Sequence, residues 1–243
     1  MILKLFNGEI YRILHKQSIY IYFGALAAGY FILAFIRSGG FGDESAVTDA
    51  MTMFSLLPAL AGGYLFSAIY TDDLNSKNLI TLVGYGAGKI TIIIVKFALI
   101  VLFGALVFTI APLYHMAVYA LLGRPAPGGA ASVIYSISLK HFLTATAYSA
   151  LSGIVVYGLQ RTTFAIVTYL LLAFGVIGSL VSIALNTFAP GLTGILVSSI
   201  TDRILYNMAN GGPFIMPVAG YIVYILIGMT LSAAVFLRKE MEF

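Results

Sequence analysis

The chain has 243 residues, of which 60% are hydrophobic and 9% charged, and its mean hydropathy is +1.01. Soluble domains carry charge on about a quarter of their residues, so this composition excludes an ordinary soluble enzyme and a disordered chain. There is no Cys, which excludes disulfides and thiolate metal sites, and the net charge of +4 bears on loop orientation rather than on nucleic acid. We expect an all-α membrane protein in which residues 1–243 form a single transmembrane domain.

The first segment, residues 1–17, has the periodicity of an amphipathic helix. Leu3, Phe6 and Ile10 fall on one face, and Glu9 and Arg12 fall on the other. Such a helix lies in the headgroup plane with its basic face toward anionic lipid. The pattern leaves open whether this interfacial helix is a membrane anchor or a mechanical part of the protein.

Six apolar segments are long enough to cross a bilayer, and all should be helices because lipid offers the backbone no hydrogen-bond partner. Six spans place both termini on the same side. The loops on that side hold twice as many basic residues as the opposite loops, so the positive-inside rule predicts a multi-pass protein of the cell membrane with both termini cytoplasmic. The expected spans are 19–36, 51–70, 90–116, 142–158, 164–185 and 214–236.

The connection at residues 71–89 predicts a short cytoplasmic helix. Thr71 suits an N-cap, and Asp72 and Asp73 suit the first turn of a helix, where the dipole favours anions. Lys77 follows Asp73 at i+4, which favours a helical ion pair. An apolar side is formed by Leu74, Leu79, Ile80 and Leu82. This helix is either a docking element for a soluble partner or a capped connector.

The glycines at positions 84–89 superficially match a phosphate-binding loop. That loop needs four residues between its first Gly and the Gly-Lys pair, followed directly by Ser or Thr. Here three residues separate Gly84 from Gly88, and Ile90 follows Lys89. We therefore expect a sharp turn, with Lys89 at the headgroups, and no nucleotide site.

Charge inside the predicted spans is rare. Lys96 is expected to extend its side chain back to the cytoplasmic surface. Asp49 is assigned to the short outer loop at residues 37–50. Because the spans then lack buried carboxylates for ion coupling and no second repeat is evident, a secondary transporter is disfavoured.

A polar stripe follows one face of the fourth span. It consists of His141, Thr144, Tyr148 and Ser152, with Ser149 beside it. These side chains either bond a neighbouring helix or line a substrate pathway.

Small residues predict close helix packing at three places, namely the Ala25/Gly29 pair, the Gly62-Gly63 pair and the Gly175/Gly178 pair. Between spans five and six, residues 186–213 are moderately apolar but interrupted by Gly and Pro. This outer segment is expected to form short re-entrant or surface helices.

An integral membrane enzyme, such as an intramembrane protease or an acyltransferase, is the alternative class. It would need His and acidic residues gathered at one depth, and His141 with Asp202 is the candidate pair. The three His residues show no metal-ligand spacing.

The predicted cytoplasmic loop at residues 71–89, with the residues that flank it, also carries a family resemblance. Residues 69–79 read Ile-Tyr-Thr-Asp-Asp-Leu-Asn-Ser-Lys-Asn-Leu and are followed by the glycine-rich stretch at 84–89 and by Lys96. This stretch resembles the first cytoplasmic loop of ABC exporter permeases of the type-2 superfamily. Six spans with an N-terminal interfacial helix agree along essentially the whole chain. Where the family commonly has Glu and a Gly-Thr pair, this chain has Asp72 or Asp73 and Asn75-Ser76, which leaves the register open.

The resemblance implies a transmembrane permease subunit that exports a peptide, drug or amphipathic substrate. It implies two separate ATPase subunits, which bind ATP and Mg²⁺, and a second permease, either another copy or a paralogue. The short helix would be the coupling helix seated in a groove of the ATPase, and its residues would include Asp72, Asp73, Lys77, Leu79 and Leu82. The chain itself would bind no cofactor and catalyse no reaction.

Overall fold

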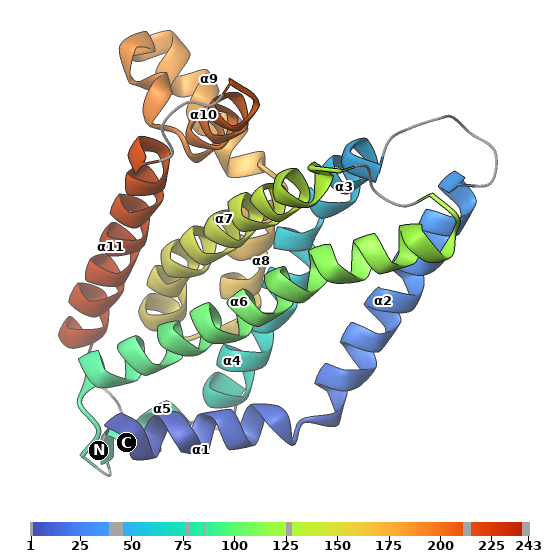
Figure 1. Ribbon diagram of the computed structural model, residues 1–243. Helices are drawn as coiled ribbons and strands as arrows, with labels where there is room; N and C mark the ends of the chain where they lie inside the picture. Colours follow the sequence, from blue (N-terminus) through green and yellow to red (C-terminus); the bar gives the residue numbers. More distant parts are fainter. Residues whose placement is uncertain are drawn as a thin grey trace.

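The computed structural model describes residues 2–38, 46–75, 78–84, 86–124, 128–210 and 215–239, and these form helices and turns without a strand (Figure 1). The expected all-α class is therefore observed. The helices are α1 (Ile2–Leu14), α2 (Gln17–Ser38), α3 (Ala46–Phe54), η1 (Pro58–Gly62), α4 (Gly63–Asn75), α5 (Asn78–Gly84), α6 (Lys89–Leu121), α7 (Ala130–Leu159), α8 (Thr162–Ala173), α9 (Val176–Phe188), η2 (Pro190–Ile195), α10 (Val197–Asn210) and α11 (Ile215–Arg238).

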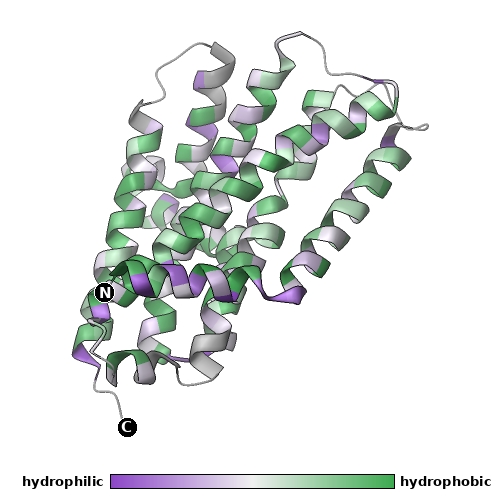
Figure 2. Cartoon of the chain, turned by 60° about the horizontal axis from the view of Figure 1, so that its bottom comes forward, coloured by the Kyte–Doolittle hydropathy of each residue, from purple (hydrophilic) through white to green (hydrophobic). Residues whose placement is uncertain are grey.

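Five apolar helical stretches in the described residues are long enough to cross a membrane, and hydrophobic residues cover most of their length (Figure 2). They are Gln17–Arg37, Ala46–Thr71, Lys89–Leu121, Ala130–Leu159 and Pro217–Arg238. The fifth predicted span is not one straight helix, because α8 and α9 meet at a bend of 62°. Gly175 sits at that bend with φ +76°, a left-handed conformation that Gly adopts without strain. The described residues thus contain five candidate spans, or six if α8 and α9 cross the membrane together as one bent span.

The second span contains an irregular segment where the chain forms the π-helical turn η1 at Pro58. A proline ring removes one backbone donor and disturbs the helical ladder. The Pro58 carbonyl accepts a hydrogen bond of 2.7 Å from the buried hydroxyl of Tyr169 on α8. A Cβ on Gly62 would lie 2.2 Å from the Tyr169 oxygen, so glycine is what lets α8 approach. The predicted close contact at Gly62-Gly63 is confirmed.

The other two small-residue predictions are wrong. A methyl group on Gly29 or on Gly178 would have no atom of another helix within 4 Å, so neither glycine lies at a tight helix contact. The close contact occurs instead between α7 and α11, where a Cβ on Gly228 would lie 2.6 Å from the backbone of Ala150. Spacing alone does not show which helix a small residue faces, and this explains the error.

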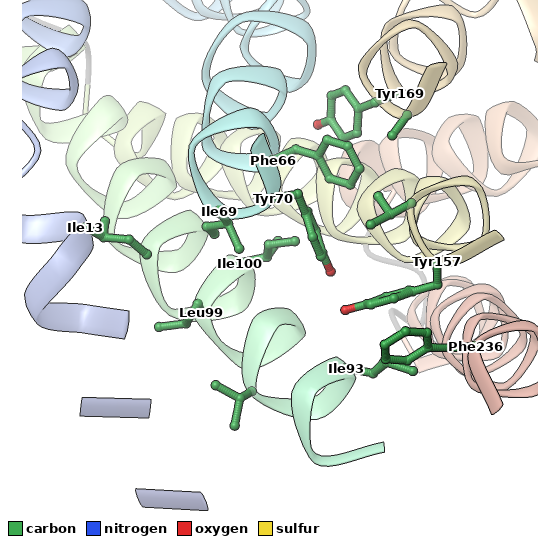
Figure 3. Packing of buried hydrophobic residues seen from close by; sticks show 13 residues of the cluster. Ile13, Phe66, Ile69, Tyr70, Ile93, Leu99, Ile100, Tyr157, Tyr169 and Phe236 are labelled. Carbon is green, nitrogen blue, oxygen red and sulfur yellow. The ribbon is translucent and has the colours of Figure 1, made fainter. Parts of the chain in front are cut away.

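The largest core cluster in the described residues packs α1 against the rest of the bundle (Figure 3). It joins Ile13 of α1 to Ile69 of α4, Leu99 of α6, Tyr157 of α7 and Phe236 of α11. Ala165 and Tyr169 of α8 belong to it as well, so one apolar cluster connects the N-terminal helix, the last helix and four helices between them. The end of the bundle opposite α1 holds η2 and α10, which fall in the segment predicted to contain short helices.

Candidate functional site

The helix predicted within residues 71–89 begins later than expected. Helix α4 continues through Asp72 and Asp73 to Asn75, and α5 begins at Asn78. Thr71 is therefore not an N-cap, because the residue lies within α4. Its hydroxyl oxygen is 2.9 Å from that of Ser67, one turn earlier in the same helix. The prediction was wrong because the apolar span extends past Tyr70 and carries the helix with it.

Some of the predicted coupling residues cannot be placed further. Lys77 lies outside the described residues, and so do the side chains of Asp72, Asp73 and Leu79. Their proposed ATPase-coupling role stays a prediction. Both aspartates belong to the last turn of α4, where the helix dipole disfavours negative charge, rather than to the first turn of a new helix.

Leu82 is described, and it faces the body of the protein. It packs with Val83 beside buried Ala87 and Ile92, and Leu5 of α1 joins the same cluster. The turn after α5 is closed by hydrogen bonds from the amides of Gly86 and Ala87 to the carbonyls of Val83 and Leu82. The end of α5 is consequently held against the start of α6, in an apolar cluster to which α1 also contributes.

A buried charge cluster lies beside this apolar contact. The Lys96 side chain on α6 is fully buried, and its Nζ lies 2.8 Å from the Glu9 carboxylate on α1. The same carboxylate oxygen accepts a hydrogen bond of 2.7 Å from Arg12, whose guanidinium also donates to the Ile69 carbonyl of α4 at 3.3 Å. The Glu9 carboxylate thus joins α1 to α6, and Arg12 joins α1 to α4. We call Glu9, Arg12 and Lys96 the charge junction.

The charge junction corrects two expectations. Lys96 does not reach a membrane surface, since it is buried against Glu9. The face of α1 that carries Glu9 does not point to headgroups, because Glu9 and Ile13 are both buried while Leu3 is exposed. A lone acid among basic residues on α1 and a lone lysine within a span were the sequence signal for this pair.

Lysines also bind helix ends at the same face of the bundle. Lys89 Nζ donates to the carbonyls of Phe236 and Lys239 at 3.0 and 2.7 Å, and Lys239 Nζ donates to the Gly158 carbonyl at 2.7 Å. Cations there satisfy terminal carbonyls and the negative end of the dipole. The C-terminal end of α11 therefore lies at the same end of the bundle as α1 and α5. Lys89 thus joins the start of α6 to the end of α11, and its expected position at the headgroups stays a prediction.

A second polar cluster lies at the other end of the bundle. Asp49 is buried, 2.7 Å from Arg37 Nε, and accepts a short hydrogen bond from Tyr119. Buried His115 donates from Nε2 to the Ala46 carbonyl at 2.9 Å, so its Nδ1 accepts from the Tyr30 hydroxyl. Asp49 was expected in a loop, yet it belongs to α3, whose helix begins in residues too polar to resemble a span. The premise that the chain lacks buried carboxylates was wrong.

The polar stripe of the fourth span faces neighbouring helices. Thr144 of α7 hydrogen-bonds the Tyr221 hydroxyl of α11 at 2.9 Å, and Thr201 of α10 contacts the same hydroxyl. His141 and Ser152 are buried and Tyr148 is half-buried. The helix-bonding interpretation has direct contacts, whereas pathway lining stays a prediction.

The pair proposed for the enzyme alternative is not joined in the described residues. Asp202 is exposed on α10 and forms no ion pair there with His141. Across the described part of the chain, no group of three or more His, Asp or Glu side chains is arranged to hold a metal ion.

Comparison with known proteins gives no family. No protein-family model matches the chain, and neither the curated proteins nor the solved structures contain a significant match. The class that the fold defines is an all-helical protein with several apolar helices long enough to span a membrane. This indicates a membrane protein.

Proposed function

We propose that the chain is the transmembrane permease subunit of an ATP-driven exporter of the type-2 ABC superfamily. Two ATPase subunits and a second permease, either another copy or a paralogue, would complete the transporter. The substrate would be a peptide, drug or amphipathic molecule. The end of the bundle with α1 and α5 would face the cytoplasm of the cell, together with both termini.

The observation that carries the proposal is the attachment of α5 to two other elements. Leu82 of α5 and Leu5 of α1 pack against the same buried pair, Ala87 and Ile92, and the charge junction ties α1 to Lys96 of α6. A push on α5 from a soluble motor would therefore move the interfacial helix and a 33-residue span as one unit. A motor shifts a conformational equilibrium only if its contacts differ between the two states, and α5 is a compact element for such contacts.

A secondary transporter is the second candidate, and buried Asp49 favours it. An acid within a candidate span that is bonded to Tyr119, whose ring stacks on His115, is the type of group through which protons are coupled to transport. Its pairing with Arg37 at 2.7 Å instead favours a structural role. The two candidates differ in their energy source.

The decisive experiment reconstitutes the purified chain with and without candidate ATPase subunits. The proposal expects copurification and substrate movement that needs ATP and persists with a protonophore. Transport by the chain alone that a protonophore abolishes would support the secondary transporter instead. Reversing the charges with Asp73→Lys and Lys77→Glu should release the ATPases while the chain remains folded. Asp202→Lys, at an exposed site on α10, is the matched control.

Sidedness gives an independent test. The chain has no Cys, so Thr81→Cys on α5 and Arg124→Cys beyond α6 each create a unique thiol at an exposed position. In intact cells an impermeant maleimide should label Arg124→Cys and spare Thr81→Cys. Labelling of Thr81→Cys from outside would refute the proposal.

A further inference from the structure

Helix α2 stands apart from the rest of the bundle (Figure 1). Only 6% of its apolar stretch is buried, against 61% for the second span. Polar contacts attach its outer half, including Tyr30 to His115, Arg37 to Asp49 at 2.7 Å, and Tyr114 to the Ala27 carbonyl at 2.8 Å. These polar contacts hold the helix in place together with the apolar contacts of Phe23 and Leu26, while most of its apolar surface stays uncovered.

A groove remains between α2 and the body formed by α3, α4 and α6. Its volume is about 400 Å³, and its walls are almost entirely apolar. It begins at the turn between α1 and α2, beside Ile13 and Ile19, and ends at Tyr30. At about 1.5 Å per residue the stretch from Ile19 to Tyr30 measures roughly 16 Å. That is about half of the ~30 Å hydrocarbon core, or the depth of one leaflet.

These dimensions fit a lipid chain. A partner helix long enough to cross the bilayer would have to pass the polar contacts of Tyr30 with His115 and of Arg37 with Asp49. An acyl chain is narrow, ends at mid-membrane and matches the apolar walls. Without an occupant, the lining side chains lose dispersion contacts on one side.

A basic residue, Lys16, lies at the mouth of the groove, where the headgroup of a bound lipid would be. Lys16 lies in the turn whose neighbours Ile13 and Ile19 line the groove, and its backbone bonds to both. We propose that the groove binds one acyl chain of an anionic phospholipid from the leaflet in which α1 lies, with the phosphate at Lys16. This inference does not depend on the proposed transport function.

The chain has no Trp, so a single introduced Trp reports on one position. Phe103→Trp places the reporter in the groove, and Leu102→Trp places it on the exposed side of the same helix. Delipidated protein in detergent is titrated with phosphatidylglycerol brominated in its acyl chains. Fluorescence of Phe103→Trp should be quenched saturably at about one lipid per chain. Leu102→Trp should be quenched only as lipid enriches the whole micelle. Identical curves for the two reporters would overturn the proposal.

Substitutions that fill the groove with a bulky side chain provide a second test of lipid binding. Ala27→Phe, or Val107→Phe should the first variant not fold, is expected to abolish the saturable phase in the Phe103→Trp background. Ala28→Phe, one residue away on the exposed face of α2, should leave it intact. Persistence of the saturable phase in both filled variants would refute the assignment.

Two further measurements compare anionic with neutral lipid and test whether a second copy of the chain occupies the groove. A basic residue at a membrane surface contributes about 1 kcal/mol toward anionic lipid, so Lys16→Gln should weaken phosphatidylglycerol binding roughly fivefold. Binding of brominated phosphatidylcholine should not change. Leu106→Cys, also in the groove, should not form a disulfide between two copies in membranes. Efficient formation would assign the groove to a second copy and overturn the proposal.

Discussion

Replacing Glu9 by Gln removes a negative charge that lies between two cations. The carboxylate contacts fully buried Lys96 at 2.8 Å and Arg12 at 2.7 Å. Breaking a buried ion pair by removing one partner costs about 3–5 kcal/mol, because the remaining charge has left water without compensation. We therefore expect Glu9→Gln to lower the free energy of unfolding by about 3–5 kcal/mol.

The geometry also predicts an asymmetry. Lys96→Met leaves Glu9 in contact with Arg12, which donates to it from Nε and Nη2 and is partly exposed. Lys96→Met should therefore lower the free energy of unfolding by about half as much as Glu9→Gln does. Because the double variant Glu9→Gln with Lys96→Met removes both charges, it should be more stable than Glu9→Gln alone.

Unfolding in mixed micelles, followed by circular dichroism as the denaturing detergent increases, measures these differences. Asp202→Asn, an exposed carboxylate on α10, is the control and should change stability by less than about 0.5 kcal/mol. Equal and small losses for Glu9→Gln and Lys96→Met would refute the reasoning. A double variant less stable than either single variant would do the same.

Three further predictions concern helix contacts. Gly228→Val puts a side chain within 2.6 Å of the Ala150 backbone, so it should destabilise the protein by about 1–3 kcal/mol in the same unfolding assay. Tyr169→Phe leaves the Pro58 carbonyl without its hydroxyl donor. The free energy of unfolding should fall by about 1–3 kcal/mol, with a corresponding fall in the melting temperature. Lys89→Met removes two donors from the end of α11, so amide hydrogen exchange should accelerate in the last turn of that helix while the rest of the chain is unchanged.

Each of these three predictions has a control or a contrary outcome. Gly178→Ala enters open space and should leave stability unchanged. The combination of Gly62→Ala with Tyr169→Phe should be less harmful than the sum of the two, because the Ala methyl would collide with the hydroxyl that Phe lacks. Additive losses would contradict that contact. Faster exchange spread over all helices in Lys89→Met would argue for global destabilisation instead of a local cap.

The candidate site shows why some residues were predicted in the wrong setting. The acidic pair Asp72 and Asp73 satisfies the rules for a first turn, and those rules are local. Helix α4 nevertheless continues to Asn75, since the packing of its preceding turns at Phe66 and Ile69 extends the helix past the apolar segment. Propensity at one turn is weak compared with the burial of a whole span.

Sequence alone determined that this chain is helical and apolar enough for a membrane, because hydropathy over about 20 residues is a local sum and lipid leaves the backbone no other partner. Tertiary structure alone decided which polar groups are buried together and which small residues lie at close helix contacts. Glu9 meets Lys96, Asp49 meets Arg37, and Gly228 meets Ala150. Each pair joins different helices, and the rotation and tilt that bring them into contact depend on the packing of the whole bundle rather than on the periodicity of either segment.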